Sequence, residues 1–240
     1  MRSLQAEEAR IHEVYERLAT TDARYSRFNY GHLFTMQQLE LHMLRALRVH
    51  GMEPLHSRRI LEIGCGNGHW LRQFIQWGAR PEHLTGVDVL EASVDEARRL
   101  CPSQVTIDRA NAAALNFPDG SFDLVLQATV FTSVLDPDFK GQLAAEMMRV
   151  TGDRGFILWY DFRFDNPWNP DVRGVNYGEI RKLFPGCDLW LRRMTLAPPF
   201  ARRLAPYSWL GCSLLEKIPW LCTHYLGMIQ KQAAPTTVRP

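Results

Sequence analysis

Three glycines at alternate positions follow the apolar segment 59–63. A helical pattern begins where they end, at residue 68. Glycine lets the backbone turn sharply and brings peptide N–H groups against a ligand with no Cβ in between. The pattern therefore predicts a strand, a bare-backbone loop and a helix N-terminus around a nucleoside-like ligand. The residues of this loop that we expect to contact the ligand are Gly64, Cys65, Gly66 and Gly68.

Two carboxylates accompany the glycine loop. Glu62 stands two residues before Gly64, and Asp88 ends the next predicted strand. Dinucleotide-binding loops usually read G-x-G-x-x-G and seat a pyrophosphate, which a carboxylate at Glu62 would repel. S-adenosylmethionine carries an ammonium group and a sulfonium and has no phosphate. The spacing therefore favours this cofactor, with Glu62 near its amino acid end.

Asp88 occupies the offset at which Rossmann-type folds hydrogen-bond a ribose diol, and Val89 would then lie beside the adenine. Each acid also has a simpler interpretation. Glu62 could be an exposed acid at a strand end. Asp88 could cap the helix predicted at 91–100, because aspartate is a favoured N-cap residue.

Four segments together resemble the successive motifs of class I S-adenosylmethionine-dependent methyltransferases, in particular the group that includes ubiquinone and menaquinone methyltransferases. These segments lie within residues 58–162 and are 61–68, 86–88, 115–123 and 149–155. The resemblance implies S-adenosylmethionine as cofactor. It also implies a final strand that runs antiparallel, inserted between the fifth and sixth strands.

The resemblance assigns further cofactor contacts by position. Family members usually carry an acid and a small residue before the third segment, where the acid accepts the adenine amino proton. The matching residues here are Asn111 and Ala112, and the asparagine keeps an amide oxygen that can accept the same bond; Asp108 is the competing candidate. Gln127 and Ala128 follow the fourth strand, where the backbone is expected to pass the sulfonium.

Strand and helix patterns alternate through the middle of the chain, which predicts an α/β fold with a Rossmann-like, seven-stranded, mostly parallel sheet and helices on both faces. The predicted strands are 59–63, 84–88, 104–108, 122–127, 155–162, 188–196 and 223–231. The predicted helices are 34–50, 68–77, 91–100, 138–150, 177–184 and 199–217.

The whole chain, 1–240, is expected to form one methyltransferase domain, because its length suits a single core. Its parts would be a helical N-terminal cover and lid (1–50), a cofactor-binding core (58–162), an acceptor-side loop with helices (163–222) and the final strand (223–232).

The composition of the chain limits the classes of binding partner that we expect. The net charge is +2, too balanced to indicate a nucleic-acid surface, so a small-molecule acceptor is expected. The five cysteines show no metal or redox spacing, and the N-terminus has no apolar segment of a signal peptide. We therefore expect a cytoplasmic protein without a metal site.

Candidate catalytic groups are fewer. Methyl transfer depends largely on alignment and desolvation, but a hydroxyl acceptor must also lose a proton, which a positioned base assists. His32 in the N-terminal cover and Asp161 after the fifth strand are the candidates. Each could also be structural.

Aromatic residues before the first strand and after the fifth predict an aromatic-lined acceptor pocket. The apolar segment 204–215, which continues through 221, is expected to be part of a core helix packed on the sheet, with a membrane-interfacial surface as the less favoured alternative. The sequence thus predicts O-methylation of a natural-product, quinone-like or sugar-bearing small molecule. The alternatives are a non-catalytic S-adenosylmethionine-binding protein and an NAD-dependent oxidoreductase.

Overall fold

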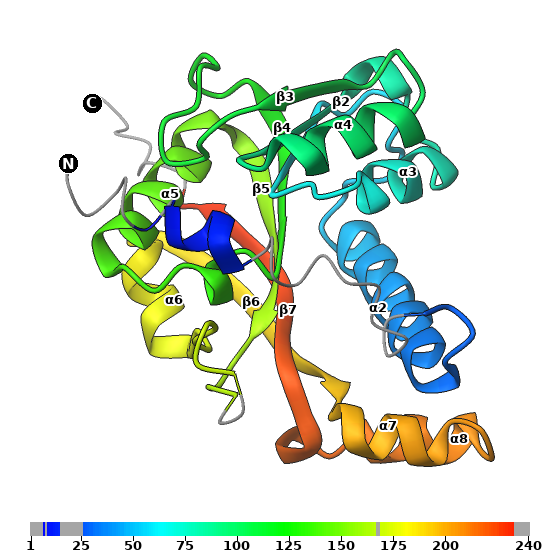
Figure 1. Cartoon of the computed structure of the whole chain (residues 1–240). Helices are drawn as coiled ribbons and strands as arrows, with labels where there is room; N and C mark the ends of the chain where they lie inside the picture. The colour runs from blue at the N-terminus through cyan, green and yellow to red at the C-terminus, as the bar shows by residue number, and fades with distance from the viewer. Residues whose placement is uncertain (1–6, 8, 15–25, 167–168, 233–240) are drawn as a thin grey trace, which may run out of the picture.

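One sheet organises the protein. The computed structural model describes Glu7 and residues 9–14, 26–166 and 169–232, and its seven strands lie in the order β3-β2-β1-β4-β5-β7-β6 (Figure 1). β1 to β5 are parallel, and β7 runs antiparallel to both β5 and β6. The predicted Rossmann-like sheet with an antiparallel last strand is confirmed. The strands are β1 (Ile60–Ile63), β2 (Leu84–Asp88), β3 (Thr106–Arg109), β4 (Phe122–Ala128), β5 (Thr151–Phe162), β6 (Cys187–Leu196) and β7 (Cys222–Lys231).

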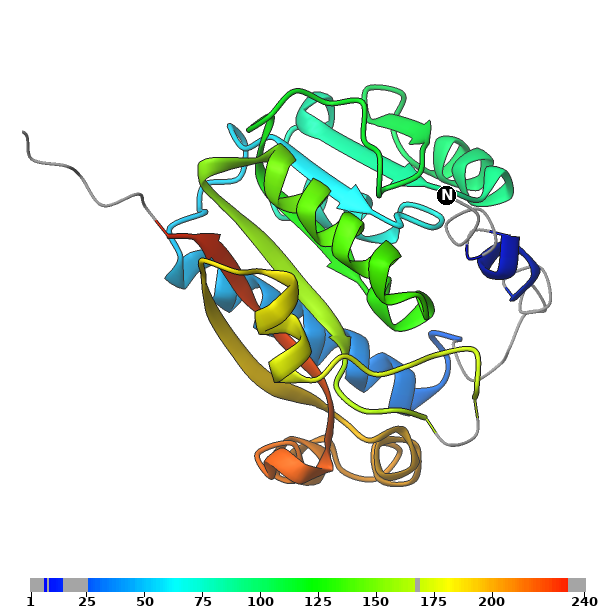
Figure 2. The ribbon, with the colours of Figure 1, turned by 90° about the vertical axis from the view of Figure 1, so that its left-hand side faces the viewer.

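Helices cover both faces of the sheet. α2, α3 and α4 contribute to one apolar cluster and α5 and α6 to the other, and Figure 2 shows α2 and α5 on opposite sides of the sheet. A third, smaller cluster joins α2 to α7 and α8. The helices are α2 (Tyr30–Val49), α3 (His69–Gln76), α4 (Glu91–Leu100), α5 (Pro137–Val150), α6 (Tyr177–Leu183), α7 (Pro198–Leu204) and α8 (Trp209–Leu215).

The central strands are apolar on both sides because both faces of a parallel sheet are covered. All four residues of β1 are buried. Ile60 packs in the cluster under α2 and α3, while Leu61 and Ile63 pack in the cluster under α5. Burial on both faces fixes the strand register and with it the position of the loop that follows β1.

The predicted core helix over 199–217 is wrong in two respects. It is two short helices, α7 and α8, separated by residues 205–208. Pro206 lacks the N–H that a continuous helix needs, and the side chain of Ser208 caps α8 by accepting from Gly211 N at 2.9 Å. The pair does not cover a face of the sheet; α7 packs on α2, and the two lie beyond one end of the sheet (Figure 1).

Close contact between α2 and α7 depends on a glycine. A Cβ at Gly31 would lie 2.7 Å from Arg202 Cα, closer than packed atoms approach. α2 begins earlier than predicted, at Tyr30, because Asn29 caps it by accepting from His32 N at 3.2 Å. The first turn of α2 is thereby held against α7, and His32 lies in that turn.

Arg149 braces the segment that follows β3. Its guanidinium donates to Leu115 O at 2.8 Å and Phe117 O at 2.7 Å, and it pairs with Glu146 and Asp119. Glu146 in turn accepts from Leu115 N at 2.8 Å. Charge-assisted bonds of this kind fix a loop firmly, so the 111–115 turn has a defined position beside β2.

Part of the predicted N-terminal cover lies outside the described residues, namely 1–6, 8 and 15–25. The described part contains a helical segment at 9–14 and the long helix α2, which agree with a helical lid. Among the residues that the structure describes, no helix has the length and apolar character needed to cross a bilayer. The single-domain interpretation stays a prediction.

Candidate functional site

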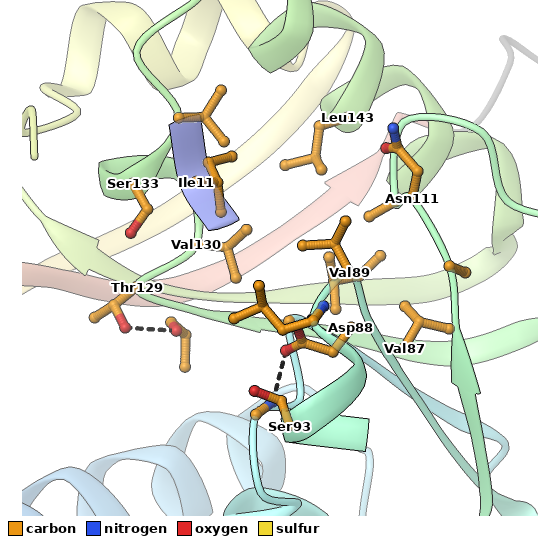
Figure 3. Close-up of a pocket in the computed structure, with 18 of the residues that line it drawn as sticks. Ile11, Val87, Asp88, Val89, Ser93, Asn111, Thr129, Val130, Ser133 and Leu143 are labelled. Atoms are coloured by element: carbon orange, nitrogen blue, oxygen red, sulfur yellow. Dashed lines mark hydrogen bonds between the residues drawn. The ribbon is translucent and has the colours of Figure 1, made fainter. Parts of the chain in front are cut away.

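A cavity of about 280 Å³ opens at the carboxyl ends of β1, β2 and β4 (Figure 3). Ligands in open α/β sheets bind at this edge. Its walls are mostly apolar, and the described residues that line it include one carboxylate, Asp88, and no lysine or arginine. We call it the first cavity. It is lined by Ile11, Ile63, Gly64, Gly66, Val87, Asp88, Val89, Leu90, Ser93, Ala110, Asn111, Ala112, Ala128, Thr129, Val130, Ser133, Val134, Phe139 and Leu143.

The three glycines have different roles. All have positive φ, 64° at Gly64, 52° at Gly66 and 72° at Gly68, a region that L-residues seldom adopt. Gly64 and Gly66 line the first cavity, and a Cβ at Gly66 would meet only open space. Gly68 is instead the N-cap of α3, where a Cβ would lie 2.5 Å from Cys101 Sγ. Gly68 is therefore required for packing, outside the lining of the cavity.

Asp88 ties the two loops at the base of the cavity together. Its Oδ2 accepts from Gly66 N at 2.8 Å, and its Oδ1 accepts from Leu90 N at 3.0 Å. The N-cap position of α4 belongs to Leu90, so Asp88 is not merely the cap of that helix. A carboxylate has about four lone-pair sites, so two acceptor positions remain for hydroxyls in the cavity.

Glu62 lies beneath the loop, 2 % exposed. Its carboxylate accepts from Leu71 N in the first turn of α3 at 3.2 Å, which supplies the side-chain cap that Gly68 cannot. Burial raises the pKa of Glu62 well above its usual range, and the nearby Asp88 raises it further. The expectation of an exposed strand-end acid is excluded. Glu62 supports the wall of the first cavity from behind.

Three expected contacts from the neighbouring strands line the first cavity. These are Val89, Asn111 and Ala112. Asn111 Oδ1 accepts from Ala113 N at 2.9 Å, which holds the turn after β3. Cys65, in contrast, is buried and outside the lining, and burial raises its thiol pKa.

Gln127 shapes the cavity without lining it. Its buried side chain accepts from Val130 N at 3.1 Å and donates to Tyr160 O at 3.4 Å. These bonds fasten the turn that carries Ala128 and Thr129. Ala128 lines the cavity as expected, whereas Thr129 was missed because its position depends on this turn.

The N-terminal helical segment covers the first cavity. Ile11 projects into it (Figure 3). Glu7 accepts from Leu135 N at 2.5 Å, and Arg10 bonds Glu7, Ser133 O and Asp171 O. The apolar spacing of residues 11 and 14 predicts this helical segment. The residues that it contacts lie far away in the chain, so the contacts themselves could not be predicted from the sequence.

A second cavity, of about 390 Å³, lies on the α2 side of the sheet. Ala128 and Thr129 line both cavities, so the two meet at this turn. The second cavity is lined by Gly31, His32, Thr35, Met36, Leu39, Trp70, Ala128, Thr129, Tyr160, Phe162, Thr195, Pro198, Ala201, Arg202 and His224.

Backbone strain is concentrated at the second cavity. Among the described residues, Thr129 (φ 61°) and Thr195 (φ 67°) are the two non-glycine residues with positive φ, and both line it. Such conformations cost of order 1–3 kcal/mol and cluster at functional sites. Thr129 N donates to Tyr160 O at 2.8 Å, and Thr195 Oγ1 bonds the Tyr160 hydroxyl at 3.0 Å. Tyr160 thus holds both strained residues.

His224, on β7, was not expected from the sequence. Thr223 Oγ1 donates its one proton to Thr195 O at 3.2 Å and lies 2.8 Å from His224 Nδ1. This arrangement favours the tautomer in which Nδ1–H donates to the hydroxyl and Nε2 is unprotonated. Burial lowers the pKa of His224 to about 3. Within the described residues, no hydrogen bond to His224 Nε2 is found, and this nitrogen is not among the fully buried atoms that lack a partner. We therefore infer that its lone pair faces the second cavity.

The two expected catalytic residues differ in position. His32 lines the second cavity, and burial followed by the charge of Arg27 lowers its pKa. Asp161 does not point toward the mouth, and that expectation is wrong. Successive residues of a strand face opposite sides, so that Tyr160 and Phe162 line the cavity and Asp161 turns away.

Asp161 is fully buried on the other face. It accepts from the hydroxyl of Thr132 and from Thr132 N at 3.2 Å. Burial raises its pKa to about 6, against the lowering effect of Thr132. Asp161 therefore positions the segment after β4.

The predicted aromatic lining is present in part. Tyr160 and Phe162 line the second cavity together with Trp70. Trp159 instead packs in the core under α5, and Phe34 packs against Trp209. Trp159 lies on the other face of β5 because side chains alternate along a strand. The early start of α2 explains the position of Phe34.

Comparison with known proteins agrees with this geometry. A family model described as "Methyltransferase domain" matches residues 60–155. A demethylmenaquinone methyltransferase of Listeria welshimeri is 25% identical over 88% of this chain and 83% of its own length. The phthiotriol/phenolphthiotriol dimycocerosates methyltransferase 1 of Mycobacterium ulcerans is 31% identical over 50% of this chain; this chain spans only 44% of that relative. The S-adenosylmethionine-dependent methyltransferase structure from Mesorhizobium loti superposes with a TM-score of 0.57, at 18% identity, over 78% of this chain and 96% of the other.

The first cavity fits the cofactor of this family. Its apolar walls suit an adenine, Asp88 retains acceptor positions for a ribose diol, and Gly66 presents bare backbone. A pyrophosphate would lie beside the carboxylate of Asp88, which would repel it. The fold, the glycine loop and the relatives agree, and together they support a class I S-adenosylmethionine-dependent methyltransferase whose methyltransferase domain spans residues 60–155.

Proposed function

We propose that this methyltransferase transfers a methyl group to a hydroxyl of an apolar small molecule bound in the second cavity. When bound, S-adenosylmethionine supplies a methyl group on a sulfonium, which is a strong leaving group. Ala128 and Thr129 line both cavities, so a donor in one and an acceptor in the other would meet there. Alignment across this turn would provide much of the acceleration.

The cofactor contacts that we propose follow the lining of the first cavity. Asp88 would bind the ribose, Val89 and Ala112 would contact the adenine, and Asn111 would accept from its amino group. Gly64 and Gly66 would present backbone to the amino acid end. Glu62 would act from behind the loop, where its carboxylate can attract the ammonium group directly or through water.

The position of His224 in the lining of the second cavity is the observation that carries the proposal of O-methylation. A neutral imidazole with a free lone pair can accept a hydrogen bond from a hydroxyl and so orient its oxygen toward the methyl group. Because that hydroxyl has one proton, methyl transfer would release it toward Nε2, and His32, on α2, would take it up from there as the final base. Both histidines line the second cavity.

The acceptor is proposed to be largely apolar. Trp70, Met36, Leu39 and Phe162 line the second cavity with few charged groups, and stacked or edge contacts of aromatic rings favour a ring or an unsaturated chain. The two curated relatives are named for a demethylmenaquinone and for phthiotriol-type dimycocerosates, which supports an acceptor of the quinone or lipid class. A sugar-bearing natural product also fits a hydroxyl-directed site.

Methyl transfer to a fractionated extract tests the proposal. The purified chain is incubated with radiolabelled S-adenosylmethionine and an organic-solvent extract of the source organism. Label is expected in an organic-soluble fraction. Acetylation of the extract beforehand blocks hydroxyls, and it should abolish that label. Persistent labelling of the acetylated extract would show transfer to carbon, and no labelling of either extract would count against an enzyme of this kind.

The sequence left a non-catalytic binding protein as an alternative. The second cavity, adjoining the first at Thr129, makes that alternative the weaker one, because a binding protein needs no acceptor site beside the sulfonium. We also propose that the enzyme acts in the cytoplasm. The five cysteines are free and buried thiols, which suits a reducing compartment.

A further inference from the structure

The region of α7, α8 and the turn after them exposes large apolar side chains. Tyr207 is 87 %, Leu210 72 % and Trp220 81 % exposed. Leu214 and Phe200 are also exposed. Single exposed apolar residues are ordinary, but several on one short segment indicate an interaction surface. We call residues 200–220 the apolar tip.

The helix α8 has one exposed apolar face and one buried face. Leu210, Leu214 and Lys217 follow at spacings of four and three residues, which places them on one face of a helical turn. The buried Cys212 packs with Ala205 and Phe34 on the opposite side. The exposed leucines are therefore not needed for the contact with α2, and no element among the described residues covers them.

Positive charge surrounds the tip. Arg202 and Arg203 end α7, and Lys217 follows α8. Between residues 197 and 221 the sequence contains one acid, Glu216, and its carboxylate already accepts from Thr195 N at 2.9 Å. Arg192 and Arg193 of β6 lie beside Lys217 around a shallow depression. The rim is thus cationic, and the centre is apolar.

The tip adjoins the acceptor side of the protein. Pro198, Ala201 and Arg202 of α7 line the second cavity. Figure 1 shows α7 and α8 at one end of the molecule, next to the first turn of α2 and away from β3 and α4. A surface that met the tip would therefore lie close to the mouth of the second cavity.

We propose that the apolar tip docks on an anionic lipid surface and that the acceptor reaches the second cavity from that surface. Exposed tyrosine, tryptophan and leucine with flanking arginine and lysine are the composition of an interfacial anchor. Basic residues near an anionic bilayer add attraction that salt weakens. The second half of this inference rests on the proposed function; the docking itself does not.

Vesicle flotation of the full chain tests the docking. The probes are vesicles of phosphatidylcholine alone and of phosphatidylcholine mixed with phosphatidylglycerol. We expect flotation with the mixed vesicles, weakened at high salt. The double variant Leu210→Ser with Trp220→Ser should lose most of it. The double variant Arg203→Gln with Lys217→Gln should weaken it by roughly fivefold for each lost charge.

Val49→Ser is the matched control, because Val49 is also strongly exposed, 80 %, but at the far end of α2. It should float like the wild-type chain. No flotation with the anionic vesicles, or equal flotation of the tip variant and the wild type, would overturn the proposal. Concentration-dependent dimers abolished by the tip variant, without flotation, would assign the surface to a second copy instead.

A further measurement separates this inference from the proposed function. S-adenosylhomocysteine binding should be unchanged in the tip variant, because Leu210 and Trp220 line neither cavity. Methyl transfer to a detergent-dispersed extract should likewise persist, whereas transfer to acceptor embedded in vesicles should fall. If the tip variant lost both S-adenosylhomocysteine binding and methyl transfer to the dispersed extract, the result would count against the proposed catalytic function, not against the docking.

Discussion

His224 stacks on Tyr160, with ring centroids 4.5 Å apart and ring planes within 4° of parallel. The two rings lie at the ends of a chain of contacts through Thr195, whose oxygens bond the Tyr160 hydroxyl and Thr223. Thr223 in turn fixes the tautomer of His224. Because these side chains are buried, the imidazole is held in one orientation in the wall of the second cavity, and we infer that its Nε2 acts there as an acceptor.

Replacing His224 should therefore impair methyl transfer more than cofactor binding. His224→Gln is expected to lower kcat by about 10²-fold, the lower end of what a positioned group contributes, with S-adenosylhomocysteine affinity unchanged by calorimetry. Thr223→Val keeps the imidazole but releases its tautomer, and should lower kcat by a smaller factor. Unaltered kcat in both variants would remove His224 from the mechanism.

His32 is tested by the pH dependence of the same reaction. As the general base it must be neutral, so kcat/KM should fall as the solution is acidified toward its pKa, which burial and Arg27 place below the usual value. His32→Gln should flatten that profile while His224→Gln keeps it. A profile that keeps its shape in His32→Gln would identify another base.

The stability of the protein should also depend on His224. Its folded pKa, about 3, lies below the unfolded value near 6.5, so the unfolded chain binds the proton first. The contribution is fully present above pH 6.5 and is lost as the pH falls toward 3, by about 1.4 kcal/mol per unit for one such group. Urea unfolding at pH 7 and pH 5 should show a smaller drop for His224→Gln than for the wild type. An equal drop would contradict the burial of a neutral imidazole.

Two glycines offer a matched pair for the first cavity. Gly66 (φ 52°) and Gly51 (φ 68°) both have positive φ, and a Cβ on either meets nothing within 4 Å. Valine at each should cost a similar ~1–2 kcal/mol of unfolding free energy. Only Gly66→Val should abolish S-adenosylhomocysteine binding, because only Gly66 lines the cavity. Equal affinity in the two variants, measured by calorimetry, would place the cofactor elsewhere.

Cofactor binding should release a proton from Glu62. Burial raises its pKa in the free protein, and an ammonium group nearby would favour the ionised form. Calorimetry in buffers of different ionisation enthalpy should therefore show proton release with S-adenosylhomocysteine. Affinity should rise with pH until Glu62 is ionised.

Two controls accompany this measurement. Methylthioadenosine lacks the amino acid group and should release no proton. Glu62→Gln can still accept from Leu71 N, so the capping contact is kept while the proton release should vanish. Proton release that persists in Glu62→Gln would assign it to another group.

The elements of the core could be predicted from the sequence because their signals are local. Short apolar runs that alternate with helical patterns predict β1 to β5. The spacing of the glycines, together with Asp88, predicts the ligand loop at the carboxyl ends of the central strands. The antiparallel insertion of β7 came from the family resemblance. The break at 205–208 was missed, since the apolar composition of 199–217 concealed the effect of Pro206 and the cap at Ser208.

The site was less predictable where it depends on strands that are distant in the chain. Asp161 ends the expected strand, but strand alternation, fixed by pairing with β7, turns it away from the cavity. His224 lies in that same β7, and its tautomer depends on Thr195 of β6. Positive φ at Thr129 also has no signal in its residue type. These features depend on pairing between strands that are distant in the chain, and that pairing cannot be predicted from a single sequence.

Calorimetry of the purified chain with S-adenosylhomocysteine and, separately, with NADH tests the central claim most directly. We expect saturable heat with S-adenosylhomocysteine, none with NADH, and a large loss of affinity in Asp88→Ala, because the Asp88 carboxylate lines the first cavity and accepts from Gly66 N. Binding of NADH, or S-adenosylhomocysteine affinity that Asp88→Ala leaves unchanged, would contradict it.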